Sequence, residues 1–138
     1  MKLTRCMFAI LGSCLTIMAV DFLTHHLLLG HFYHAHAAWW RPEAQMQALI
    51  PFLFASQLTL AILLTAVYAK GYEAGKGGIG QGMRFGFLMG MVLQLPKQLM
   101  LYFVYPYPVS LLIIWGMGGL METVLAGAVI GLLYQPAK

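Results

Sequence analysis

Four long runs of apolar residues, joined by short polar segments, dominate the chain. They cover about residues 5–29, 44–69, 82–104 and 109–134. Each run has the ~20 residues that an α-helix needs to cross the hydrocarbon core of a bilayer. None carries the charged face, repeated at every turn, that a helix of a soluble protein exposes to water. The pattern therefore predicts an all-α integral membrane protein whose four transmembrane helices form a bundle.

The composition agrees with a membrane protein of one domain. Of the 138 residues, 61% are apolar and only 9% are charged. Four membrane spans leave too little chain for a second domain, so residues 1–138 are expected to form one unit. The formal net charge of +4 is spread over the ends of the spans. This distribution favours membrane lipids as partners and no nucleic acid.

The basic residues indicate how the helices are oriented in the membrane. Arg41 lies at one set of span ends. The opposite set holds Lys2, Arg5, Lys70, Lys76, Arg84 and Lys138. Because Lys and Arg are enriched in cytoplasmic segments, we expect cytoplasmic N- and C-termini. The glycine-rich loop between the second and third spans should then be cytoplasmic too.

Two short motifs are similar to processing sites. Leu11-Gly12-Ser13-Cys14 resembles a lipoprotein cleavage box, and Ala35-His36-Ala37 resembles a signal-peptidase site. The first apolar run, however, is much longer than the ~7–15 residues of the apolar region of a signal peptide. We expect this run to be retained as a helix.

Small residues recur every four positions in the third and fourth spans. This spacing places them on one helical face, where another backbone can approach closely. The two faces consist of Gly82, Gly86 and Gly90 in the third span and Gly119, Thr123, Gly127 and Gly131 in the fourth. These spans are therefore predicted to form a close antiparallel pair.

Several polar side chains lie inside the spans, where contact with lipid is costly. They are Asp21, His25, Gln57, Gln94, Lys97, Gln98 and Glu122. Asp21 and Lys97 each lie about seven or eight residues from the same end of their spans, hence at nearly the same depth. An ion pair between them is the expected way to neutralise both charges. Such a pair would be a structural clamp or, with His25, a relay for protons or solutes.

Glu122 lies near the middle of the fourth span, level with Gln57 and close in depth to Gln94. No cation is expected at that depth. The sequence therefore favours a protonated Glu122 that hydrogen-bonds to an amide. An ionised Glu122 that takes part in ion chemistry is the alternative.

All five histidines lie close together in the sequence, around the end of the first span. They are His25, His26, His31, His34 and His36. Imidazole is a common metal ligand, and Met18 or Met46 could add a thioether for copper or another transition metal. The spacing matches no closed zinc or copper motif, and Trp39 and Trp40 indicate an interfacial aromatic belt instead. No cofactor is therefore expected, with a metal site as the alternative.

Five short motifs are distributed over most of the chain. They are Asp21-x-x-x-His25, Tyr33, Trp40-Arg41-Pro42-Glu43-x-x-Met46, Gly82-x-Arg84-Phe85-Gly86 and Tyr105-Pro106-x-Pro108. Together they resemble a group of small, uncharacterised bacterial four-helix membrane proteins, to which no activity is attached. The resemblance implies a multi-pass protein of the bacterial inner membrane. Trp39, Lys97 and the additional histidines depart from the pattern of that group.

Three classes of function fit these features. The favoured one is a structural or accessory subunit that docks through its glycine-lined faces, as a homo-oligomer or in a larger membrane protein complex. The second is a small oligomeric proton-coupled transporter that uses Glu122 or Asp21. The third is a periplasmic metal or cofactor site built from the cluster between His25 and His36. An enzyme is least supported, since no serine or cysteine has a base at a spacing that would activate it.

Overall fold

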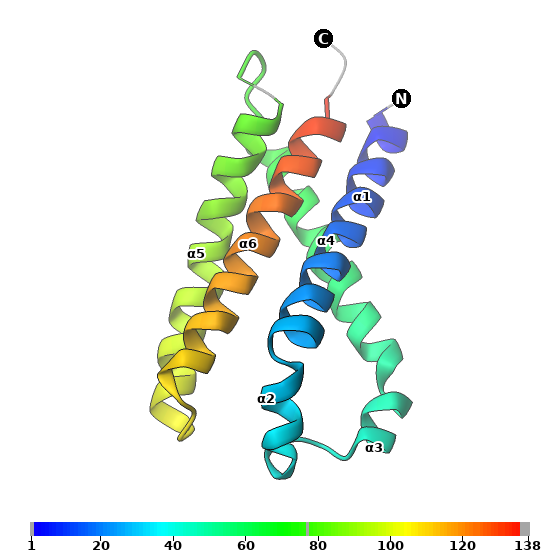
Figure 1. Cartoon of the computed structure of the whole chain (residues 1–138). Helices are drawn as coiled ribbons and strands as arrows, with labels where there is room; N and C mark the ends of the chain where they lie inside the picture. The colour runs from blue at the N-terminus through cyan, green and yellow to red at the C-terminus, as the bar shows by residue number, and fades with distance from the viewer. Residues whose placement is uncertain (1, 77, 136–138) are drawn as a thin grey trace.

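The computed structural model describes residues 2–76 and 78–135, and for Lys2 the backbone alone. The elements of the described chain, in order, are α1 (Lys2–Phe22), the π-helix η1 (Leu23–Leu28), α2 (Gly30–Ala35), the 3₁₀ turn η2 (Ala37–Trp39), α3 (Glu43–Ala48), α4 (Ile50–Lys70), α5 (Ile79–Val104) and α6 (Val109–Leu133). Four stretches are long and apolar enough to cross a membrane: Leu3–Leu28, Ile50–Lys70, Ile79–Val104 and Val109–Leu133. The predicted all-α membrane protein with four spans is confirmed (Figure 1).

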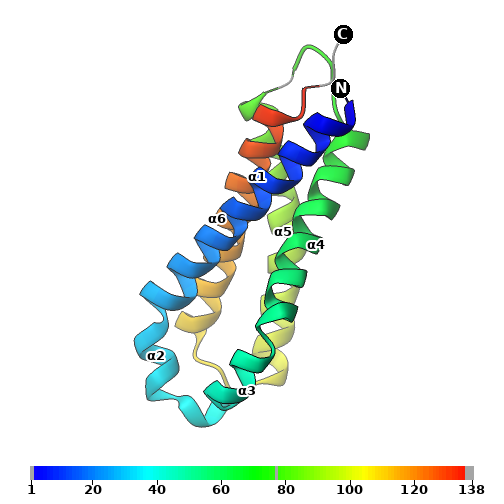
Figure 2. The ribbon, with the colours of Figure 1, turned by 90° about the vertical axis from the view of Figure 1, so that its right-hand side faces the viewer.

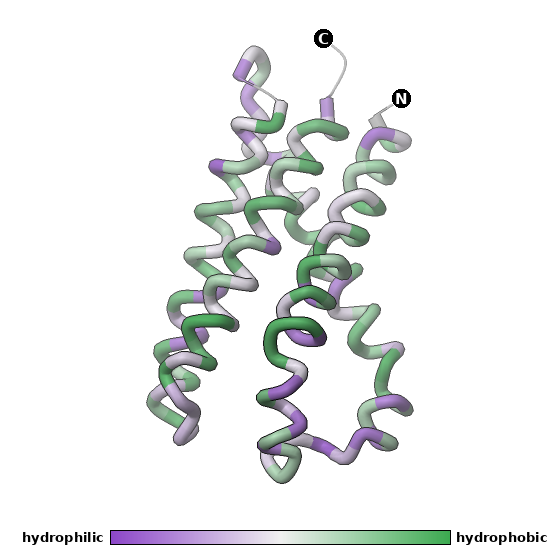
Figure 3. Tube along the Cα trace, viewed as in Figure 1, coloured by the Kyte–Doolittle hydropathy of each residue, from purple (hydrophilic) through white to green (hydrophobic). Residues whose placement is uncertain are grey.

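The two ends of the described chain lie at the same end of the bundle, as an even number of spans requires. The loop between α4 and α5 lies there too, whereas α2 and α3 lie at the opposite end (Figure 1, Figure 2). Hydrophilic residues gather at these two ends, and the long helices between them are mainly hydrophobic (Figure 3). Of the basic residues that predict a cytoplasmic location for the first end, Lys138 lies outside the described residues.

The glycine faces of α5 and α6 meet along the two helices. Gly82 lies against Gly127 and Gly131, and Gly86 lies against Thr123. A Cβ atom added to Gly86 would lie 2.8 Å from the carbonyl carbon of Thr123, which is backbone and cannot move aside. Glycine is therefore required here by the close approach of the two helices.

The apolar core occupies the half of the bundle that is nearer the chain ends. Its fully buried side chains come from α1, α4 and α6: Ala9, Ile17, Ala61, Leu64, Tyr68, Ala126 and Ile130. Helices α1 and α4 cross in the view of Figure 1, and in the view of Figure 2 they separate toward α2 and α3. The other half of the bundle is therefore the one that can contain cavities.

Two predicted spans differ from the structure in their course. The run 44–69 is broken at Leu49 into α3 and α4, because Pro51 lacks the N–H that would continue the hydrogen bonds of one helix. The first span continues beyond α1 as a π-helix, in which the Leu29 N–H donates to the Thr24 carbonyl oxygen at 3.1 Å. Such wide turns are frequent at functional sites, and this one carries His25.

The glycine contact leads to a prediction within one helix. Gly86→Ala should lower the free energy of unfolding by about 1–3 kcal/mol, because the new methyl group collides with the backbone of α6. Gly80→Ala is the matched control in α5, since a Cβ there meets no heavy atom of the described chain within 4 Å. It should be neutral or stabilising, because alanine favours helix more than glycine does. Unfolding of both variants in mixed micelles checks this, and equal effects would contradict the close α5–α6 contact.

Candidate functional site

Four titratable side chains from the spans surround one cavity of about 250 Å³, which we call the ionic cavity. Asp21 comes from the end of α1, His25 from η1, Lys97 from α5 and Glu122 from α6. A charged group at the centre of a spanning helix costs about 2.5–3.5 kcal/mol when it faces lipid. Because charged side chains are so costly in a membrane, their convergence from three spans on one cavity marks the candidate functional site.

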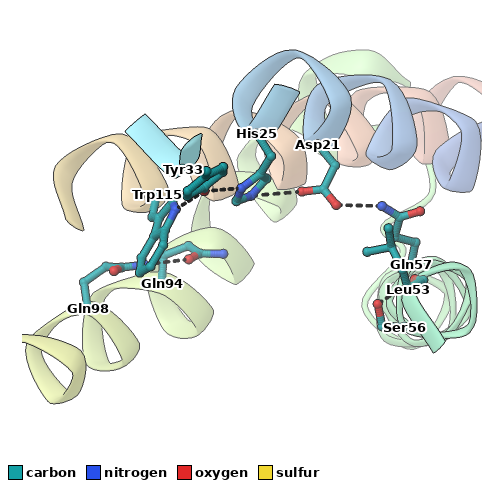
Figure 4. Close-up of polar contacts among 9 residues, drawn as sticks. All are labelled: Asp21, His25, Tyr33, Leu53, Ser56, Gln57, Gln94, Gln98 and Trp115. Carbon is teal, nitrogen blue, oxygen red and sulfur yellow. Dashed lines mark hydrogen bonds and ion pairs between the residues drawn. The ribbon is translucent and has the colours of Figure 1, made fainter. Parts of the chain in front are cut away.

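A chain of hydrogen bonds runs along the wall of the ionic cavity (Figure 4). The indole Nε1 of Trp115 donates to the Tyr33 hydroxyl oxygen at 2.7 Å. The same hydroxyl lies 2.6 Å from Nδ1 of His25. Nε2 of His25 lies 3.4 Å from Oδ1 of Asp21. The chain thus connects α6, α2, η1 and α1.

The chemistry of the partners determines the direction of these bonds. The Trp115 indole can only donate, and an ionised Asp21 can only accept. His25 therefore carries its proton on Nε2 when Asp21 is ionised, and its Nδ1 accepts the proton of the Tyr33 hydroxyl. A further proton that reached Nδ1 would allow His25 to pass its Nε2 proton to Asp21. The arrangement can therefore relay protons.

Asp21 makes its closest polar contact with α4. The Gln57 amide Nε2 donates to Oδ2 of Asp21 at 2.6 Å. The predicted ion pair between Asp21 and Lys97 is wrong, since no ion pair joins them in the described chain. Their equal depth does place both on the ionic cavity, but depth could not show that an amide of another helix reaches Asp21 instead.

Glu122 lies next to the middle residue of α6 and is half-buried. Its carboxyl group makes neither a hydrogen bond nor an ion pair with any residue in 2–76 or 78–135. The expected amide partner is therefore not in place. The sequence placed no cation at the depth of Glu122, yet Lys97 lines the same cavity. A lysine side chain is long enough to reach a space away from the depth of its own Cα atom.

The two glutamines of α5 lie on glycines of α6. Gln94 packs against Gly119 and Gln98 against Gly116, and Nε2 of Gln98 donates to Oε1 of Gln94 at 3.3 Å. Gln94 lines both the ionic cavity and an apolar groove of about 420 Å³ along α5 and α6. The amide pair therefore separates the ionic cavity from the groove.

A second cavity of about 490 Å³, the outer cavity, lies at the end of the bundle that holds α2 and α3. His34 and Arg41 line it, and His25 and Trp115 line both the outer cavity and the ionic cavity. The Tyr33 hydroxyl joins His25 to Trp115. These three side chains therefore form the partition between the two cavities.

The histidines are not brought together. His26 stacks on Phe22 with ring centroids 4.9 Å apart, and His36 stacks on Phe32 at 4.2 Å. His34 lines the outer cavity, and His31 is exposed. No group of three or more His, Cys, Asp or Glu side chains in the described part of the chain is arranged to hold a metal ion. The geometry therefore gives no support to a metal site at these residues.

The sequence did not point to a role for two residues of the site. Tyr33 appeared only within the resemblance, and Trp115 lies among apolar residues of the last span. Trp115 has an indole N–H, which seeks a partner when it is buried in a membrane, and this was the available signal. Its partner, 82 positions away in the sequence, could not be inferred from spacing.

The chain matches no protein-family model, and neither a curated protein nor a solved structure matches it.

The contact between Asp21 and Gln57 can be measured by a double-mutant cycle. Asp21→Ala combined with Gln57→Leu should show a coupling energy of about 0.5–3 kcal/mol, because these side chains share a hydrogen bond. The matched cycle of Asp21→Ala with Lys97→Met should show a smaller coupling. Unfolding of the single and double variants in micelles gives the two coupling energies. A larger coupling for Asp21 with Lys97 than for Asp21 with Gln57 would support the predicted ion pair instead.

The partition predicts a change of stability at alkaline pH. Tyr33 lies outside the spans, and burial raises the pKa of its hydroxyl above the ordinary 10.0; the Trp115 hydrogen bond opposes this rise, and the charge of Asp21 adds to it. The folded protein thus holds this proton more tightly than the unfolded chain. The resulting stability is complete below the unfolded pKa and is lost as the pH rises through the folded pKa. Melting temperatures above about pH 10 should fall more steeply for the natural protein than for Tyr33→Phe, and parallel slopes would refute the prediction.

Proposed function

We propose that this protein is a small multi-pass transporter of the bacterial inner membrane that exchanges a solute for a proton in the ionic cavity. The observation that supports it best is the convergence of Asp21, Lys97 and Glu122 from three spans on one cavity. Glu122 is the proton carrier in this proposal. Its carboxyl group lies at mid-span without a partner in the described chain, so a proton or a solute can bind there without breaking a protein contact.

The uneven packing of the bundle is consistent with access from one side. The buried core lies between the ionic cavity and the chain ends, whereas the outer cavity lies on the opposite side of the His25–Tyr33–Trp115 partition. A solute would enter through the outer cavity when the partition opens. By the distribution of basic residues we place the outer cavity on the periplasmic side and both termini in the cytoplasm.

The hydrogen-bond chain would carry protons past the partition while it is closed to solutes. Beyond the Trp115 indole, which can only donate, Tyr33 is the first group of the chain that can both accept and donate; it lines the outer cavity, and Asp21 lines the ionic cavity. Proton movement along hydrogen-bonded side chains requires only that each group accepts on one side and donates on the other. Tyr33 and His25 both meet this condition.

An accessory role is the second candidate. The glycine faces that favoured it pack against each other within one chain, so they are not available to a partner. One other observation favours docking: Oε1 of Gln98 is buried and has no hydrogen-bond partner in the described chain. A donor from a second copy or from a larger complex could reach it through the apolar groove along α5 and α6.

Exchange in liposomes separates the two functions. The purified protein is reconstituted with an entrapped pH-sensitive dye and exposed in turn to gradients of small ammonium cations, carboxylates and neutral amino acids. We expect one class to change the internal pH, and we expect Glu122→Gln to abolish this change because an amide cannot release a proton. Glu73→Gln is the matched control, since Glu73 lies outside the spans and pairs with Lys76 at 2.7 Å.

One result of this experiment would favour the accessory role, and another would keep exchange but remove Glu122 as the proton carrier. The first is that no class of solute changes the internal pH although the protein is folded. The second is a pH change that Glu122→Gln leaves intact, which would mean that the exchanged proton is carried elsewhere.

A further inference from the structure

We propose that the ionic cavity takes a small monovalent organic cation in exchange for the proton of Glu122. This inference rests on the proposed function and specifies its substrate class. It is carried by the charges on the cavity wall, by the size of the cavity and by the kind of side chains between the charges.

The charge balance of the cavity favours one positive charge. Its titratable groups are Asp21 and His25 on the first span, Lys97 on α5 and Glu122 on α6. Helix α4 contributes the neutral Gln57 to Asp21. His25 is neutral in the hydrogen-bond chain, so two carboxylates face one ammonium and leave one negative charge uncompensated. An anionic solute would add to this imbalance in a medium where unbalanced charge is costly.

The size and the wall of the cavity favour an organic cation over a metal ion. Its volume of about 250 Å³ is below the ~300–1,000 Å³ of pockets for drug-sized molecules, but it exceeds what a bare ion needs. Trp115 forms part of the wall, and on the α6 side Gly118 and Gly119 are covered by the side chains of Thr24 and Gln94. An aromatic ring beside carboxylates is the environment that binds ammonium groups well.

The exchange conserves charge. With the cavity empty, Glu122 holds a proton, and Asp21 and Lys97 balance each other. When the cation enters, Glu122 releases one proton and becomes the counter-ion of the solute. One positive charge replaces another, and a carboxylate that holds the solute cannot also keep its proton. Competition for Glu122 therefore couples the two movements.

Lys97 has a distinctive role in this proposal. Its ammonium is a cation that belongs to the protein, and it lines the cavity without an ion pair to either carboxylate among the described residues. It therefore competes electrostatically with a cationic solute. Removing it should strengthen the binding of a cation, whereas it would abolish the binding of an anion.

Three probes of nearly equal shape test the class of solute. They are choline, its neutral carbon isostere dimethylbutanol and the anionic dimethylbutanoate, each titrated calorimetrically into the full chain in detergent. We expect only choline to bind and to release protons into the buffer. Its affinity should fall by up to about tenfold per pH unit on acidification, because one proton competes with it.

Charge variants with matched controls test the site. Glu122→Gln should weaken choline binding by at least about tenfold and abolish proton release, and Lys97→Met should tighten binding by about tenfold, both by the loss of one nearby charge. Glu73→Gln and Lys76→Met, which change the exposed pair outside the spans, should leave binding unchanged. Melting curves identify any variant that fails to fold. Tighter binding by Lys97→Met can come only from folded protein.

The outcomes separate this inference from the proposed function. If dimethylbutanoate binds and Lys97→Met abolishes this binding, the substrate is an anion and the inference is wrong. The proposed exchange at Glu122 would not be contradicted by that result. Binding of none of the three probes, or of dimethylbutanol as tightly as choline, would also overturn the inference. Choline binding that is equal in Glu122→Gln and releases no protons would overturn both the inference and the proposed function.

Discussion

The close contact between the backbones of α5 and α6 is the constraint on which the site depends. Apolar side chains gain little by leaving lipid for another apolar surface, so membrane helices associate through tight packing and interhelical polar contacts. Gly82, Gly86 and Gly127 allow the backbones to touch. Their contact holds the position of α5 along α6 and thereby brings Lys97 to the same cavity as Glu122.

The bundle is divided into two halves with different physical character. In the half near the chain ends, apolar side chains of α1, α4 and α6 fill the interior. In the other half, α4 diverges (Figure 2), and the interior contains polar side chains and cavities. A half of fixed shape and a half that can rearrange are what a membrane site with controlled access needs. The same division places the costly polar groups where hydrogen bonds between helices can satisfy them.

The π-helix η1 shows how a local irregularity serves the site. Thr24 is buried beside Gly118 of α6, where a methyl group added to the glycine would lie 2.7 Å from its side chain. The next residue, His25, faces both Asp21 and Tyr33. A wide turn at this point allows consecutive residues to meet different partners. The apolar pattern of the first span does not reveal the π-helix, because a π-helix and an α-helix can have the same composition.

The sequence alone determined the features that follow from regular spacing and from the cost of polar groups in a membrane. Four spans, the glycine faces of α5 and α6 and the polar residues inside the spans could all be predicted, since helix periodicity and hydropathy act locally. Even so, the break before Pro51 was missed, although its missing N–H was visible in the sequence.

The partners of the polar residues were decided by tertiary structure alone. Counting along the spans placed Asp21 level with Lys97 and Gln57 level with Glu122, but the crossing of α1 and α4 brings Gln57 to Asp21. Tyr33 and Trp115, far apart in the chain, meet where α2, which continues beyond the first span, comes within hydrogen-bond distance of α6. Depth in the membrane follows from counting residues along one helix. The direction in which a side chain points, and the neighbour it reaches, depend on how helices rotate and cross, and no single span contains that information.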